Sequence, residues 1–163
     1  PHAYWEPLNQ SSRGLDAEIS GSLTDRWQVY AGYTFNRSTN RNSVGDNVES
    51  RLKGYNFSSH TPKHMFRLYT SYILPVDDGK WTVGLGLKSS SKTANSYGSI
   101  KQGGYTVWNT NVQYRPSKNL QLGLAINNLT DKRCYENQYS RAANSGSFYG
   151  EPRNVVFSLK WKM

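Results

Sequence analysis

Large apolar residues recur at every second position in several stretches of this sequence. The closing stretch NVVFSLKWKM shows the pattern, because Val155, Phe157 and Leu159 alternate with mostly polar neighbours. Successive side chains of a β-strand point to opposite faces, so a period of two predicts a strand with one apolar face. We expect about seven such strands and no helix of useful length. The other six stretches are residues 15–23, 27–35, 66–74, 81–88, 105–114 and 120–127.

The connections between these strands are alternately short and long. The short connections are TDR, PVDDGK and RPSKN, which are rich in turn-forming residues. Their length requires antiparallel neighbours, because a parallel pair needs a crossover of roughly a dozen residues. The long connections are residues 37–62, 89–103 and 130–152. All tight turns then fall at one end of the sheet, which is typical of outer-membrane barrels with short periplasmic turns and long outer loops.

Aromatic residues gather at the ends of the predicted strands. Four of them lie beside a short turn or the C-terminus, on the apolar face: Trp27, Trp81, Tyr114 and Trp161. Trp and Tyr favour the membrane–water boundary, so we interpret these four as a membrane-interface girdle. Tyr33, Phe35 and Phe66 are candidates for the opposite girdle. The alternative is a soluble sandwich or lipocalin-like barrel with aromatic packing, but its loops should be shorter.

Composition supports a membrane barrel over other classes. The mean hydropathy of −0.77 is too polar for a helical membrane protein, and no run approaches the roughly 20 apolar residues of a spanning helix. Aromatic residues reach 13%, which fits strands with aromatic ends. The net charge of +9 would permit nucleic-acid binding, but the basic residues are scattered and no nucleic-acid partner is expected. The single cysteine, Cys134, excludes an internal disulfide framework.

No catalytic or metal-binding constellation is evident. The three histidines lack the spacing of a metal-ligand motif, so no metal or cofactor is expected. Asp16 and Glu18 share one strand face, where we expect lumen solvation or pairing with basic residues. A barrel hydrolase would need a grouped Ser, His and acid, and His64 and Ser71 are too far apart along one strand. We therefore predict that the protein is not an enzyme.

The predicted strand number indicates part of a larger barrel. A barrel closes when its last strand pairs with its first, and bacterial barrels usually have an even number of strands. Seven strands do not fit, and by turn parity the chain begins inside a long outer loop. The alternative is a complete small barrel with an adhesion or structural role and no active transport. It needs an eighth strand before Arg13, where PHAYWEPLNQSS is a poor candidate.

Four segments of the chain resemble TonB-dependent siderophore receptors, in the same order. They are SRGLDAEISGSLTDRWQVYAGYTF, TPKHMFRLYTSYILP, NLQLGLAINNLTDKRCYENQ and FYGEPRNVVFSLKWKM. The resemblance implies the C-terminal part of a 22-stranded barrel whose N-terminal plug is absent from this sequence. It also implies import of a ferric siderophore, within the hydroxamate-type group, with iron carried only as cargo. The implied partners are the TonB complex through the plug, outer-membrane lipid and lipopolysaccharide, around a monomer in the bacterial outer membrane.

Recognition of a ferric siderophore calls for aromatic and basic side chains. Such rings and cations bind a polar chelate by stacking, hydrogen bonding and charge. The outer loops and the upper lumen supply the candidates, which are Tyr55, Phe57, Tyr97, Trp108, Tyr135, Tyr139, Arg141 and Tyr149.

Overall fold

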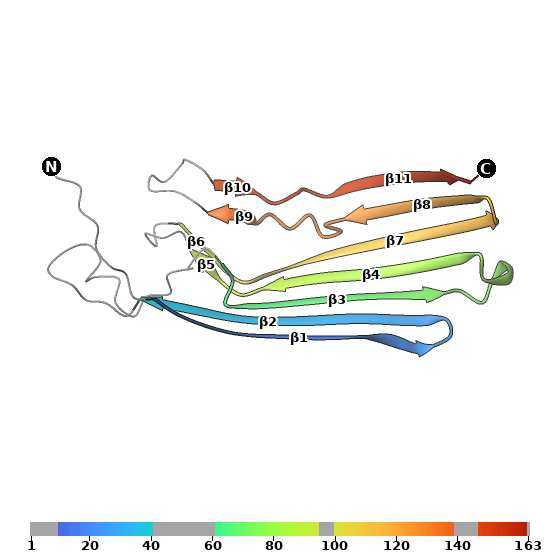
Figure 1. Ribbon diagram of the computed structural model, residues 1–163. Helices are drawn as coiled ribbons and strands as arrows, with labels where there is room; N and C mark the ends of the chain where they lie inside the picture. Colours follow the sequence, from blue (N-terminus) through green and yellow to red (C-terminus); the bar gives the residue numbers. More distant parts are fainter. Residues whose placement is uncertain (1–9, 41–60, 95–99, 139–146, 163) are drawn as a thin grey trace, which may run out of the picture.

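The protein forms one curved antiparallel sheet with short ladders at one end (Figure 1). The computed structural model describes residues 10–40, 61–94, 100–138 and 147–162. The seven-stranded sheet has the order β1-β2-β3-β4-β7-β8-β11, so strands adjacent in the sheet follow one another along the chain. These strands are β1 (Gln10–Thr24), β2 (Trp27–Asn40), β3 (His64–Ile73), β4 (Trp81–Ser90), β7 (Tyr105–Ser117), β8 (Leu120–Asn127) and β11 (Asn154–Trp161). The prediction of an all-β antiparallel fold is confirmed.

The register of the sheet keeps one face apolar across all seven strands. Leu68 lies opposite Ala31 on one side and Leu87 on the other. Val112 lies opposite Val83 and Leu124, which places the apolar residues of β7 at its even positions. Because side chains alternate along each strand, this register gathers the polar residues on the other face.

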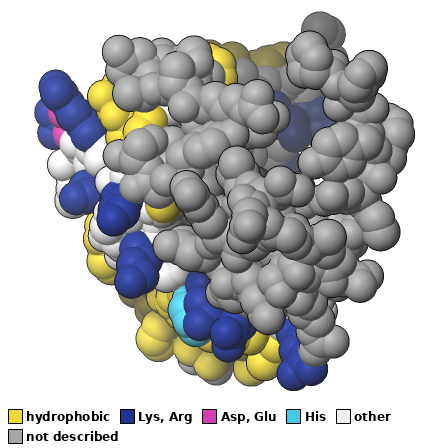
Figure 2. Space-filling model, turned by 90° about the vertical axis from the view of Figure 1, so that its left-hand side faces the viewer, with side chains coloured by type: hydrophobic (Ala, Val, Ile, Leu, Met, Phe, Trp, Pro, Cys, Tyr) yellow, Lys and Arg dark blue, Asp and Glu magenta, His cyan; other side chains and the backbone are white. Residues whose placement is uncertain are grey.

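The described part of the chain is a single layer without a conventional core. Cys134 is the only buried hydrophobic residue among the described residues, whereas Ile19 is 72% exposed and Phe157 is 67% exposed. Figure 2 shows hydrophobic side chains gathered along the outside of the molecule, with Lys and Arg side chains beside them. A continuous apolar face of this extent requires lipid or another apolar surface over it. No helix in the described ranges is long and apolar enough to cross a membrane.

Several strands are longer than the apolar alternation predicted. β2 continues to Asn40, so the predicted loop at 37–62 begins within a strand. The outer part of β1 and β2 is polar, and Ser12 and Ser38 pair there through their hydroxyls at 2.9 Å. Backbone pairing needs no apolar side chain, so a period-two pattern underestimates the length of such strands. The other two predicted loops contain short ladders, β5 (Thr93–Ala94) with β6 (Lys101–Gln102) and β9 (Tyr135–Gln138) with β10 (Ser147–Tyr149).

The short turns close the opposite end of the sheet. In PVDDGK, the 3-10 turn η2 (Asp77–Gly79) has positive φ at all three of its residues. Asp77 accepts a hydrogen bond from Lys80 Nζ at 2.9 Å and from the Tyr114 hydroxyl at 3.2 Å. The bond from Lys80, followed by that from Tyr114, lowers the pKa of Asp77 below its ordinary value. The turn is therefore held by a charged pair and by an aromatic residue of the next strand pair.

Candidate ligand-binding site at the loop end

The predicted ligand residues divide into those inside and those outside the described ranges. Three are described, namely Trp108, Tyr135 and Tyr149. Outside the described residues lie Tyr55, Phe57, Tyr97, Tyr139 and Arg141. Within the described residues, no group of three or more His, Cys, Asp or Glu side chains could hold a metal ion.

Tyr135 and Tyr149 come together as a stacked pair. They lie opposite each other in the β9–β10 ladder, with ring centroids 4.7 Å apart and planes inclined by 19°. Their hydroxyl oxygens are 3.3 Å apart. This hydrogen bond raises the pKa of the Tyr135 phenol above its ordinary value. The pair presents a flat aromatic surface with two hydroxyl groups at its edge.

The stacked pair is anchored to the neighbouring ladder. The Gln102 side chain of β6 donates to the Tyr135 carbonyl at 3.1 Å and accepts a hydrogen bond from the Tyr135 backbone N–H. Gly150, directly after β10, donates its N–H to the Cys134 carbonyl at 2.8 Å. A Cβ at Gly150 would lie 3.0 Å from Cys134 Sγ, so glycine permits this close approach. These contacts hold both tyrosines at fixed positions relative to β6.

Asn128 ties this loop region to the sheet. It is 3% exposed and has a φ of 50°, a left-handed conformation that Asn adopts more readily than most residues. Its side chain accepts the Lys132 N–H at 2.8 Å and donates to the carbonyls of Lys132 and Glu151, each at 3.0 Å. Its backbone N–H donates to the Asn109 side chain at 2.9 Å. One buried amide therefore joins the start and the end of the loop to β7.

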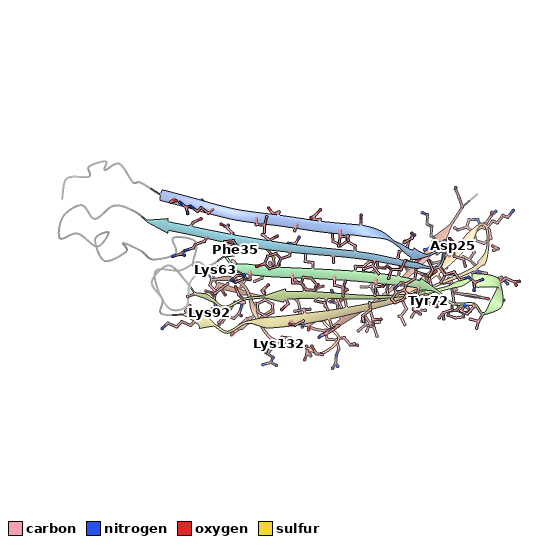
Figure 3. All side chains as sticks on the ribbon, turned by 90° about the horizontal axis from the view of Figure 1, so that it is seen from below. Asp25, Phe35, Lys63, Tyr72, Lys92 and Lys132 are labelled. Atoms are coloured by element: carbon pink, nitrogen blue, oxygen red, sulfur yellow. The ribbon has the colours of Figure 1, made fainter. Side chains whose placement is uncertain are left out.

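A pocket of about 380 Å³ lies beside the tyrosine pair. Lys132 and Arg133 supply two cationic groups, and Figure 3 shows Lys132 at the loop end of the sheet. The Arg153 N–H donates to the Asp131 side chain at 3.0 Å, which fixes one wall. The pocket is lined by Asp131, Lys132, Arg133, Tyr149, Gly150 and Pro152. This basic pair was not predicted from the sequence, although the run DKRCY places it shortly before Tyr135, a predicted ligand residue.

Trp108 does not belong to this site. It lies opposite Leu87 in the sheet, and therefore on the apolar face, not in the upper lumen or an outer loop. The expectation for Trp108 rested on its position near a long loop. The even positions of β7 are apolar, however, and Trp108 is one of them.

The polar face carries hydrogen-bonded pairs between strands. Tyr30 donates to Glu18 Oε1 at 3.0 Å, which joins β2 to β1 on this face. Tyr69 donates to Asn111 Oδ1 at 3.3 Å across Gly84, where a Cβ would lie 2.2 Å from that oxygen. Glycine at this position leaves room for the bond. This face can line a hydrated lumen.

The proposed girdle residues lie on the apolar face at the short-turn end. Trp81 stacks on Tyr114 with centroids 4.3 Å apart, and Trp161 lies exposed at the end of β11. Trp27 meets Tyr72 edge-on at 6.5 Å. Rings at this level suit a membrane boundary, where the ring is buried and its polar atom stays near water.

A family model described as TonB dependent receptor-like, beta-barrel matches residues 5–129. The ferric-pyoverdine M114 receptor PbuA of Pseudomonas sp. is 33% identical over 91% of this chain and 18% of its own length. The catecholate siderophore receptor Fiu of Escherichia coli K12 is 29% identical over 89% of this chain and 19% of its own length. The chain thus spans about a fifth of these relatives.

The chain also resembles solved structures over almost its full length. The pyoverdine outer membrane receptor FpvA from Pseudomonas aeruginosa PAO1, bound to pyoverdine, superposes with a TM-score of 0.76 at 29% identity. The match covers 96% of this chain and 22% of the receptor chain. The seven-stranded sheet therefore matches a segment of the barrel wall of that receptor.

Proposed function

The chain belongs to the TonB-dependent receptor β-barrel family, and we propose that it forms the C-terminal part of the barrel of an outer-membrane receptor that binds and imports a ferric siderophore. The family is one of outer-membrane transport receptors, not of enzymes. Import would draw its energy from TonB through a plug supplied by another part of the receptor. The receptor would work as a monomer.

The proposed place in a barrel is supported by the two faces of the sheet. The apolar face would contact outer-membrane lipid, with lipopolysaccharide at the loop end, and Trp27, Trp81, Tyr114 and Trp161 would mark the opposite boundary. The polar face would line the lumen. Within the described residues, β1 and β11 each have a neighbour on one side only. Unpaired strand edges are not tolerated in lipid, so further strands would complete the barrel.

The observation that carries the proposal is the pairing of the stacked tyrosines with the basic pocket. Tyr135 and Tyr149 offer an aromatic face, and Lys132 and Arg133 offer two positive charges beside it. A ferric siderophore is a compact chelate with polar and often anionic edges, which such groups recognise by stacking and charge-assisted hydrogen bonds. Tyr55, Phe57, Tyr97, Tyr139 and Arg141 remain further candidates for contacts from the outer loops. The finer proposal for the ligand is the hydroxamate-type group.

Binding to the full-length receptor tests the proposal. A panel of one ferric hydroxamate, one ferric catecholate and ferripyoverdine would be titrated against the wild type and the double variant Lys132→Gln/Arg133→Gln. Loss of two charge-assisted contacts, each worth roughly 1.5–3 kcal/mol, should weaken binding by at least tenfold. The matched control is Lys118→Gln/Lys162→Gln, which removes the same charge at the short-turn end and should leave binding unchanged. A folded receptor that binds none of the three ligands would contradict the proposed function.

Growth of intact cells tests the transport step. Cells with iron only as the bound ferric siderophore should grow with the wild-type receptor and fail to grow when TonB is deleted. Growth that is independent of TonB would contradict energised import while leaving binding intact.

A further inference from the structure

Two cations lie next to each other on the polar face of the sheet. Arg67 of β3 and Lys88 of β4 are directly opposite in the register, and both are exposed. Within the described ranges the one ion pair joins Lys80 to Asp77, so neither cation has an acidic partner there. Arg67 donates to the Met65 thioether at 3.5 Å, and sulfur is a weak acceptor. Like charges directly opposite in an antiparallel pair repel each other, so this position suits an anion bound between them.

The acid in the same row of the sheet is bonded elsewhere. Glu18 of β1 is separated from Arg67 by Gly32 of β2. The two strand spacings between Glu18 and Arg67 amount to about 10 Å. Glu18 instead accepts the Tyr30 hydroxyl at 3.0 Å, and that hydroxyl would lie 3.4 Å from a Cβ at Gly32. The phenol therefore lies between the carboxylate and the guanidinium.

Two tyrosines lie beside the cations on the same face. Tyr30 and Tyr69 are opposite each other, two residues further towards the short turns. The Tyr69 ring runs along β4, because a Cβ at Gly86 would be 3.6 Å from its Cδ2 and a Cβ at Gly84 would be 2.7 Å from its hydroxyl. Tyr69 is 43% exposed and Tyr30 is 36% exposed. The two glycines thus let the Tyr69 ring lie against the wall with one face open to the lumen.

A hollow of about 310 Å³ lies against the same two tyrosines. It spans β1, β2 and β3 on the polar face, and its other polar side chains are Ser20, Ser22, Gln28 and Ser71. Within the described part of the chain these four side chains have no hydrogen-bond partner, so their hydroxyl and amide groups are available to a bound molecule.

The lumen wall therefore repeats the chemistry of the loop-end site. In both places a pair of tyrosines lies beside a pair of cations. The order along the wall is also suggestive of a route. Lys88 is two residues from Ser90 at the outer end of β4, so the cations lie nearest the loops, followed by the tyrosines and then the hollow.

We propose that this cation pair, tyrosine pair and hollow form a second site for the ferric siderophore, which holds the chelate after it leaves the loop end. The inference rests on the proposed function, in which the polar face lines the lumen. An anionic edge of the chelate would lie between Arg67 and Lys88, and a flat edge would stack on Tyr69. An acidic side chain from another part of the receptor is the competing occupant, but a single carboxylate would use neither the ring nor the hollow.

Binding and uptake by the full-length receptor separate the two sites. Ferripyoverdine, one ferric catecholate and one ferric hydroxamate would each be loaded with radioactive iron. Equilibrium binding to the purified receptor and the rate of uptake by intact cells would then be measured. Arg67→Gln/Lys88→Gln should keep the binding affinity within twofold of wild type and lower the maximal uptake rate at least fivefold. Wild-type uptake by this variant would overturn the lumen site.

Two controls show whether the effect comes from charge at this position. The exchange Arg67→Lys/Lys88→Arg keeps both charges and should keep the wild-type uptake rate. Lys160→Gln/Lys162→Gln removes the same charge at the short-turn end and should also keep it. An equal loss of uptake in the exchange variant or in the second control would overturn the assignment of the cation pair.

The stability of the siderophore-free receptor tests the competing occupant. If the cations met an acid elsewhere in the receptor, Arg67→Gln/Lys88→Gln would break an ion pair and unfold at a lower urea concentration. Without such an acid, removal of two like charges that face each other should leave the urea midpoint unchanged or raise it. A lowered midpoint would therefore overturn the siderophore as the occupant of the cation pair.

A variant in the hollow tests the site without a change of charge. Ser71→Leu fills the hollow and should lower the maximal uptake rate at least threefold, whereas Ser71→Ala should keep at least half of it. Heat-modified electrophoretic mobility would check that both variants fold, and equal uptake by the two would overturn the role of the hollow. A wild-type receptor that imports none of the three siderophores would contradict the proposed function, and the lumen site would fall with it. Normal uptake by the wild type and by every variant would overturn the lumen site alone.

Discussion

Arginine substitution at Leu124 gives the most direct test of the two faces of the sheet. Leu124 lies in β8, opposite Val112 and Phe157, and is 43% exposed on the apolar face. It is four residues from Leu120, which pairs with the girdle residue Trp161. With a rise of about 3.4 Å per residue and a tilt of about 40°, Leu124 lies roughly 10 Å inside the boundary. This depth is close to the middle of an apolar band about 25 Å tall.

The depth sets the expected loss of stability. An arginine facing lipid near the midplane costs about 2–4 kcal/mol, and the cost falls towards the interface. We expect Leu124→Arg to lower the free energy of unfolding of the full-length receptor by about 2–4 kcal/mol. Leu122 lies at roughly half that depth, so Leu122→Arg should lower the free energy of unfolding by about half as much. Unfolding would be followed by urea titration in lipid vesicles.

Two controls separate the effect of face from those of size and charge. Leu124→Met keeps the apolar volume and should cost less than about 1.5 kcal/mol. Ala125→Arg places the same charge one residue further along the strand, on the polar face, where water can solvate it. It should cost clearly less than Leu124→Arg. Equal costs at the two positions, or equal stability of the Leu124 arginine and methionine variants, would refute the assignment of Leu124 to lipid.

Three further predictions concern the turns, the loops and the polar face. An epitope tag at Asn144 should be labelled on intact cells, and a tag inside η2 should not; the reverse pattern would invert the topology. Because its pKa is lowered in the folded state, the Asp77 carboxylate stabilises the protein at pH values above its unfolded-state pKa of about 4. This stability is lost as the pH falls through the lower folded-state pKa. The stability difference between wild type and Asp77→Asn should therefore shrink on acidification, and a full difference persisting at a pH of about 2 would contradict this reasoning. Gly84→Ala should displace the Asn111 amide and lower the free energy of unfolding by about 1 kcal/mol, as measured by urea titration. An unchanged free energy of unfolding would contradict this prediction.

The sequence predicted the architecture because the pleat imposes a period of two on any strand with one apolar face. Residues 120–127 were predicted as a strand, and β8 has those bounds. Tyr114 was predicted to lie on the apolar face of the strand at 105–114, which assigns the even positions of that strand to this face. The register confirms the even face for β7 and also shows why Trp108 was placed wrongly. Local alternation was sufficient for these features.

The candidate site was only partly predictable. Tyr135 and Tyr149 were chosen by residue type, but their stacking depends on a ladder between segments separated by residues 139–146. Asn128 was missed because a buried Asn differs from an exposed one only through its partners, which come from the far end of the loop. Lys132 and Arg133 were missed because only the folded loop shows that both residues line a pocket beside Tyr149.

The sequence by itself determined the apolar-patterned parts of the seven strands of the main sheet, their faces and the ends at which turns and loops lie, because each depends on residues close together along the chain. Only the tertiary structure decided which side chains meet across strands. The Trp27–Thr70 and Tyr69–Asn111 hydrogen bonds join residues more than forty positions apart along the chain. Strand register sets such meetings, and it depends on backbone pairing summed over whole strands, which no single segment of the sequence contains.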